Sequence, residues 1–241
     1  MHKRTPSLGA RLSYIWYNTT YMQTNYVLGL LAALFLYAPY VQAFDAVLEI
    51  VPAQYEVVSI QNPETEQLIL GELEGDPEMF EVFSETPFIL TAEIRAIPES
   101  GVIIKPELSG IVIKQKEIRG VEEVARMNAE DVSWDLMTDS ESGLKYQAGP
   151  YFSEQMASGT YRIEISSPEN KGKYMLLIGN QSDKNGYGAS LADIKMVYQF
   201  YGLGTLRMFS SPYVHYPIGI IILVGLIGGT WYLHRKQKLY A

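Results

Sequence analysis

An uncharged, apolar stretch near the C-terminus constrains this chain more than any other feature. No Asp, Glu, Lys or Arg occurs within residues 209–233, and nearly every residue from Pro217 onward is apolar. Residues 213–233 would form a helix of about 30 Å at ~1.5 Å rise per residue, which matches the hydrocarbon core of a bilayer. Aromatic residues, which favour membrane interfaces, lie at both edges of the stretch: Tyr213, Tyr216, Trp231 and Tyr232. A buried core helix is the alternative, but it would not explain these aromatic edges. The sequence therefore predicts a transmembrane helix at 213–233.

Charge is divided unevenly along the chain. Residues 44–216 contain all 27 acidic residues and 13 of the 19 basic ones, so this region carries 13 − 27 = −14 of formal charge. The charged residues of the two flanks are all basic. A basic flank is typical of the cytoplasmic side of a membrane protein. We therefore expect an acidic body outside the cytoplasm, a cytoplasmic tail at 234–241 and a location in the cell membrane. Nucleic acid is not an expected partner, because its phosphates repel an acidic surface.

The N-terminal part has the features of an export signal. Basic residues precede an uncharged apolar run at 26–38, and Val41-Gln42-Ala43 offers a small-residue cleavage pattern. The apolar run is short for a spanning helix. We predict a signal segment at 1–43, cleaved after Ala43; an uncleaved first helix is the alternative.

The middle of the chain shows the alternation of β-strands. Leu90, Ala92 and Ile94 alternate with polar residues within 87–96, and residues 160–165 alternate in the same way. Residues 173–178 are more continuously apolar, as in a central strand. Further strands are predicted at 46–51, 55–60, 67–73, 78–83, 102–105, 110–114 and 131–137.

Turn residues separate these candidates and include Gly75-Asp76-Pro77, Ser109-Gly110, Gly149-Pro150 and Ser158-Gly159. Short strands with no helix between them favour an antiparallel β-sandwich, here at 44–182. Trp134, the tryptophan of this region, is expected to anchor its core; a sugar-stacking surface site is the alternative.

A helical segment is predicted at 189–209. Ser190 and Asp193 resemble a capping box, and Gly202 and Gly204 would end the helix. Its apolar face consists of Leu191, Ile194, Val197, Tyr198 and Tyr201. Two placements fit: it packs on its own sheet, or it lies on the membrane with Lys195 and Arg207 near the headgroups.

Residue types limit the available chemistry. The chain has no cysteine, and its histidines are His2, His215 and His234. None of these lies in the predicted sandwich, which argues against catalytic triads and zinc or copper sites there. The densest acidic run comprises Glu72, Glu74, Asp76, Glu78 and Glu81. It lacks a calcium-loop spacing, and solvated strand edges explain it more simply. We therefore predict no catalytic residue, no cofactor and no metal site.

Two Gly-x-Tyr segments suggest a resemblance. Gly159-Thr160-Tyr161 and Gly172-Lys173-Tyr174 each begin a predicted strand, and together they form an expected hairpin. This pattern resembles the closing strands of jelly-roll sandwiches such as bacterial pre-peptidase C-terminal domains and GOLD domains. The layout also resembles that of uncharacterised bacterial membrane-anchored proteins. The resemblance implies a jelly-roll-like ectodomain that binds or assists, and it carries over no functional residue.

These observations predict a mainly β, single-pass membrane protein. The expected function is that of a non-catalytic extracytoplasmic binding or accessory module. Its partners would be the lipid bilayer and other membrane or envelope proteins. A carboxylate-dependent glycan hydrolase at the cell surface and a structural or adhesion protein are the alternatives.

Overall fold

The computed structural model describes residues 47–50, 56–98, 105–116, 118–181 and 187–239. These residues belong to one compact unit, Gln42–Ala241. The predicted signal segment 1–43, with its cleavage site, and most of the predicted strand 102–105 lie outside the described residues.

The described part is built mostly from β-strands. The strands are β1 (Val47–Ile50), β2 (Val57–Ile60), β3 (Gln67–Glu74), β4 (Glu78–Ser84), β5 (Phe88–Ala96), β6 (Ser109–Gln115), β7 (Val121–Met127), β8 (Asp135–Thr138), β9 (Lys145–Met156), β10 (Gly159–Ser166) and β11 (Lys171–Ile178). The helices are α2 (Tyr187–Phe200), α3 (Pro212–Leu239) and the short 3-10 helices η2 (Ala129–Asp131) and η3 (Thr205–Ser210).

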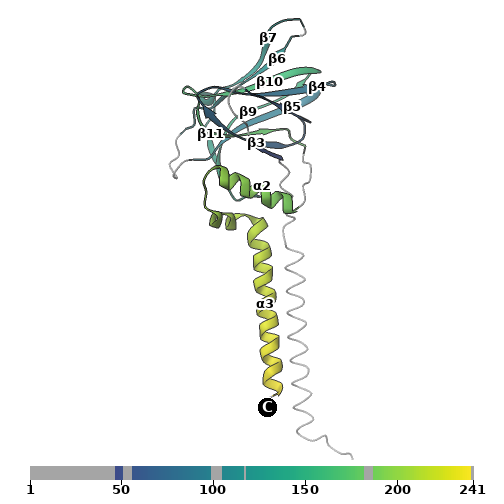
Figure 1. Ribbon diagram of the computed structural model, residues 1–241, viewed down its shortest axis with the longest axis vertical. Coiled ribbons are helices and arrows are strands. Elements are labelled where there is room, and N and C mark those ends of the chain that lie inside the picture. Colours follow the sequence, from purple (N-terminus) through teal and green to yellow (C-terminus); the bar gives the residue numbers. More distant parts are fainter. Residues whose placement is uncertain (1–46, 51–55, 99–104, 117, 182–186, 240–241) are drawn as a thin grey trace, which may run out of the picture. The chain divides into compact units, whose positions relative to one another are not determined.

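The strands form two sheets with a shared core (Figure 1). The six-stranded sheet has the order β1-β3-β11-β5-β9-β8, and the five-stranded sheet has the order β2-β4-β10-β6-β7. The predicted mainly β fold with a sandwich-like core is confirmed. The pairing is not wholly antiparallel, however, because β1 pairs with β3 and β2 with β4 in parallel.

The expected hairpin of the two Gly-x-Tyr segments is wrong. β10 and β11 belong to different sheets, so the turn between them is an arch from one sheet to the other. Tyr161 and Tyr174 are both buried in the core between the sheets. An arch and a hairpin show the same local pattern of alternating residues and turn residues. They differ only in whether the two strands pair with each other or with distant strands. Here β10 pairs with β4 and β6, and β11 pairs with β3 and β5.

The alternation of the predicted strands determines which side chains form the core. Leu90, Ala92 and Ile94 of β5 are buried there, as predicted. β11 is buried on both faces: Leu176 faces the other sheet, and Met175 belongs to a second apolar cluster that includes α2. The prediction of a central strand at 173–178 is therefore confirmed.

Two strands were not predicted, and one of them crosses a predicted turn. β7 is partly exposed and carries several charged residues, while β9 contains Gly149-Pro150. The pairing of β5 with β9 shifts register between Glu93 and Arg95, opposite this dipeptide. A bulge accommodates a proline because the ladder is already interrupted there. Ser109-Gly110, also predicted as a turn, begins β6 instead.

The predicted strand 131–137 is only partly correct. η2 ends at Asp131, Trp134 has a positive φ of 54°, and β8 begins at Asp135. Trp134 is nevertheless a core residue with 2% exposure, and its indole N–H donates to the Ala129 carbonyl at 3.1 Å. The prediction of a core anchor is confirmed, and the sugar-stacking alternative is wrong.

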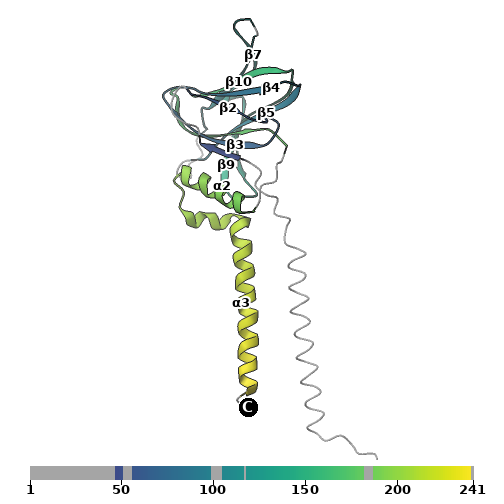
Figure 2. The ribbon, with the colours of Figure 1, turned by 45° about the vertical axis from the view of Figure 1, so that its right-hand side comes forward.

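Helix α2 packs on the outer face of the six-stranded sheet, as Figure 2 shows. Its apolar face meets Leu68 and Leu70 of β3 and Met175 of β11. Of the two predicted placements, packing on its own sheet is correct. The helix begins at Tyr187, so Ser190 lies inside it and the predicted cap is wrong.

The predicted end of α2 is confirmed in detail. Gly202 has a φ of +63° and donates to the Gln199 carbonyl, while Leu203 donates to the Tyr198 carbonyl. This pair of bonds is a Schellman motif, which needs a left-handed residue at the Gly202 position.

Helix α3 is long and apolar enough to cross a membrane. It is longer than the predicted 213–233, because it begins at Pro212 and continues through most of the predicted tail to Leu239. Its large apolar side chains are exposed: Ile220, Ile221, Ile222, Val224, Leu226, Trp231, Tyr232 and Leu233.

Candidate functional site

The acidic run does not form one site. Glu81 accepts hydrogen bonds from Arg162 and Gln115, and Glu72 pairs with Lys173 at 3.6 Å. The expectation of solvated strand edges fits Glu72 and Glu74, which lie beyond the pairing of β1 with β3. It does not fit Glu81, which lies where β4 is paired with β2 on one side and with β10 on the other.

Glu78 instead lies against the core. The Tyr174 hydroxyl donates a hydrogen bond to its carboxylate. Burial raises the pKa of Glu78 above its ordinary value, and the hydrogen bond from Tyr174 partly opposes that shift. Burial also raises the pKa of Tyr174. This pair is structural, because Tyr174 is fully buried.

His215, the histidine whose side chain is described, lies outside the sandwich core. His2 and the His234 side chain are outside the described residues, and His215 lies in the first turns of α3 with its Nδ1 3.3 Å from the Phe209 carbonyl oxygen. Within the described ranges, no three His, Asp or Glu side chains gather as a metal site would require.

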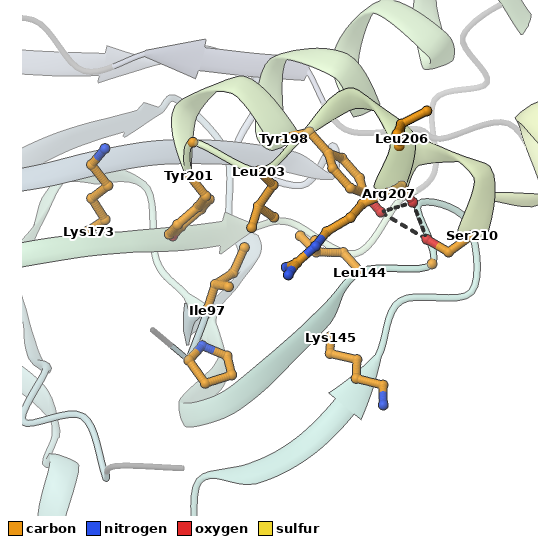
Figure 3. Close-up of a pocket in the computed structure, with 14 residues that line it drawn as sticks. Ile97, Leu144, Lys145, Lys173, Tyr198, Tyr201, Leu203, Leu206, Arg207 and Ser210 are labelled. Carbon is orange, nitrogen blue, oxygen red and sulfur yellow. Dashed lines mark hydrogen bonds between the residues drawn. The ribbon is translucent and has the colours of Figure 1, made fainter. Parts of the chain in front are cut away.

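A hollow of about 1060 Å³ lies where α2, η3 and the sheet meet. Figure 3 shows that its walls come from segments far apart in the sequence. The lining residues are Ile97, Pro98, Gly143, Leu144, Lys145, Lys173, Tyr198, Tyr201, Gly202, Leu203, Gly204, Leu206, Arg207 and Ser210. We call this hollow the α2–η3 pocket.

The loop between β8 and β9, residues 139–144, forms one wall of the pocket and contacts both α2 and η3. Within the loop, the Asp139 carboxylate accepts from the Ser142 N–H at 2.6 Å, and Gly143 donates to the Asp139 carbonyl. The Tyr198 hydroxyl lies 3.2 Å from the Ser142 carbonyl oxygen and 3.1 Å from Ser210 Oγ. These contacts fix α2 and η3 on the loop.

The charge of the pocket wall is opposite to that of the surrounding body. Lys145, Lys173 and Arg207 line it, and no Asp or Glu of the described ranges does so. Lys173 is already engaged, because its Nζ donates to the Phe200 carbonyl at 2.8 Å and pairs with Glu72. In the part of the chain that the structure describes, Lys145 and Arg207 form no ion pair. In Figure 3 the Arg207 guanidinium extends toward Leu203 and Ile97.

Tyr201, which lines the pocket, carries a polar group without a described partner. The Tyr201 hydroxyl is buried and makes no hydrogen bond to any described residue. Burial raises the pKa of this phenol well above its ordinary value, so it is a neutral donor. Buried hydroxyls usually have a partner, which makes this one unusual.

Of the three cations that line the pocket, sequence reasoning gave a binding role to only one. It associated Arg207 with lipid headgroups, but it gave no role to Lys145 or Lys173. No local motif joins these residues, because they come from different strands and loops. The available signal was the presence of basic residues in a strongly acidic region. The sequence does not show which of them come together, because that depends on the fold.

No family model matches the chain, and no curated protein matches it. Among solved structures, the chain is similar to the pre-peptidase C-terminal domain of a collagenase from Bacillus anthracis. The identity is 11%, the TM-score is 0.32, and the match covers 53% of this chain and 98% of that domain.

Proposed function

We propose that this chain is a membrane-anchored, extracytoplasmic and non-catalytic binding or accessory module that works as a subunit of an envelope or membrane complex. The supporting observation is the joint between the sandwich and α3. Tyr213, in the first turn of α3, is 2% exposed in the same apolar cluster as Ile194 of α2 and Leu70 of β3. Ser211, directly before α3, bonds to the loop at 139–144. A fixed joint holds a module in one orientation above the membrane, as a docking subunit requires.

The proposed topology is testable because the chain has no cysteine. Single cysteines would be placed at Ile118, which is 98% exposed, and at Lys236 in the basic end of α3. A membrane-impermeant maleimide should label the Ile118→Cys chain in intact cells and the Lys236→Cys chain only after permeabilisation. Equal labelling of both before permeabilisation, or the reverse pattern, would contradict the topology.

The proposed role is tested by affinity isolation of the full-length chain from solubilised membranes. We expect the same membrane or envelope protein in repeated isolations. A matched variant carries a flexible Gly-Ser insertion between Ser210 and Ser211, which keeps both parts but releases the joint. Recovery of the partner should fall with this variant. Isolation of only a monodisperse monomer from the unmodified chain would contradict the proposal.

A further inference from the structure

We propose that the α2–η3 pocket binds a phosphate-bearing anion, and that this anion is the headgroup of an anionic phospholipid in the membrane that holds α3. The inference deepens the proposed function and rests on its membrane anchoring. It assigns a ligand class to a pocket that no motif in the sequence marks.

The first support is the charge of the wall. The predicted body carries −14, yet among the described residues the pocket is lined by Lys145, Lys173 and Arg207 and by no carboxylate. Lys145 and Arg207 are exposed and form no ion pair with a described residue. A guanidinium offers two parallel donors to phosphate oxygens, and an ammonium adds a further charge.

The second support is the main chain of the wall. Gly202 and Gly204 also line the wall, and an added Cβ would meet nothing within 4 Å at either residue. Because glycines have no side chain, a ligand has access to the main chain there.

The third support favours a lipid over a soluble anion. Arg207 lies in η3, the segment that leads directly into α3, and its neighbour Leu206 is 79% exposed. Phe209 of the same segment is 50% exposed. Exposed apolar residues beside a cation are typical of a segment at the headgroup level. Leu206 and Ile97 also line the pocket, so its wall offers apolar surface to the glycerol and upper acyl chain.

The test uses the full-length chain in a neutral detergent. Binding of dihexanoyl-phosphatidylglycerol and dihexanoyl-phosphatidylcholine is measured by titration, and inorganic phosphate is added as a competitor. The Lys145→Gln/Arg207→Gln variant removes the two cations without an ion pair. The matched control, Lys116→Gln/Arg119→Gln, removes two exposed cations from the turn between β6 and β7, at the opposite end of the sandwich from α2 in Figure 2.

We expect phosphatidylglycerol to bind at least ~10-fold more tightly than phosphatidylcholine, because only the first carries net negative charge. The pocket variant should lose at least ~10-fold in phosphatidylglycerol affinity through loss of charge-assisted hydrogen bonds, and the control should keep the affinity of the unmodified chain.

Equal affinity for both lipids, or equal losses in both variants, would overturn the inference. Inorganic phosphate that binds as tightly as phosphatidylglycerol would overturn the assignment to a lipid and identify a soluble anion as the source. The proposed function fails separately, through loss of partner recovery or of the maleimide pattern, neither of which depends on lipid selectivity.

Discussion

The Ser211 hydroxyl donates a hydrogen bond of 2.6 Å to the Glu141 carbonyl, and so joins the start of α3 to the loop at 139–144. The same Oγ accepts from the Tyr213 N–H at 3.2 Å. Ser211 is therefore the N-cap of α3, with Pro212 at the first helical position, where proline is favoured. One side chain begins the helix and fixes it to the sandwich.

The Ser211→Ala variant should consequently lose both interactions. We expect a destabilisation of about 2 kcal/mol, because a lost N-cap costs ~1 kcal/mol and the lost hydrogen bond costs a similar amount. The measurement is the thermal midpoint of the full-length chain in detergent. Ser84→Ala is the control, since Ser84 bonds only locally to Thr86 on an exposed turn. Equal midpoints for the two variants would contradict the joint.

Tyr198 of α2 and Tyr201, directly after the helix, give a second matched pair. The Tyr198 hydroxyl is within 3.2 Å of the Ser142 and Arg207 carbonyl oxygens, whereas the Tyr201 hydroxyl has no described partner. Tyr198→Phe should lower stability by about 1 kcal/mol, and Tyr201→Phe should leave it unchanged or raise it. Chemical denaturation of both variants in one detergent checks this contrast. A loss in Tyr201→Phe as large as that in Tyr198→Phe would show that Tyr201 is bonded.

Gly143 tests how closely η3 lies on the loop. Its φ is +70°, and an added Cβ would lie 2.6 Å from the Ser210 carbonyl oxygen. Gly120 has a φ of +95° but open space around it. Gly120→Ala should cost about 1 kcal/mol for backbone strain alone, and Gly143→Ala should cost ~1–3 kcal/mol more because the backbone must move. Similar losses in thermal stability would mean that the loop and η3 are not packed together.

The parts of the fold that the sequence predicts are those that short-range patterns determine. Strands β5 and β10 alternate, β11 is apolar from Tyr174 to Ile178, and α3 is uncharged over a membrane's thickness. The end of α2 follows from Gly202, because a left-handed residue is needed there. Each of these signals lies within a few neighbouring residues.

The predictions that failed depend on contacts between residues far apart in the sequence. Gly149-Pro150 indicates a turn locally, but it lies in a bulge of β9. An added Cβ on Gly149 would be 2.4 Å from the Trp134 ring, so the glycine is required by a residue of another segment. The α2–η3 pocket likewise joins Lys145, Lys173 and Arg207, and only the packing of α2 on the sheet brings them to one wall.

Glu78 provides a prediction about pH. Burial raises its pKa in the folded state above the ordinary value of 4.5, so the folded chain binds this proton more tightly than the unfolded chain does. The stabilisation from the protonated group is therefore complete at pH below 4.5 and is lost as the pH rises through the folded-state pKa. Glu78→Gln is uncharged and still offers an oxygen to the Tyr174 hydroxyl, so it should not show this loss.

The thermal midpoint of Glu78→Gln should hence rise relative to that of the unmodified chain as the pH increases from 4.5 through the folded-state pKa, and the difference should then become constant. Glu85→Gln is the control, because it makes the same change of charge at an exposed residue. Its difference from the unmodified chain should vary less with pH. A Glu78→Gln chain that loses stability relative to the unmodified chain as the pH rises would mean that the folded state favours the carboxylate. Burial would then not be the dominant influence on Glu78.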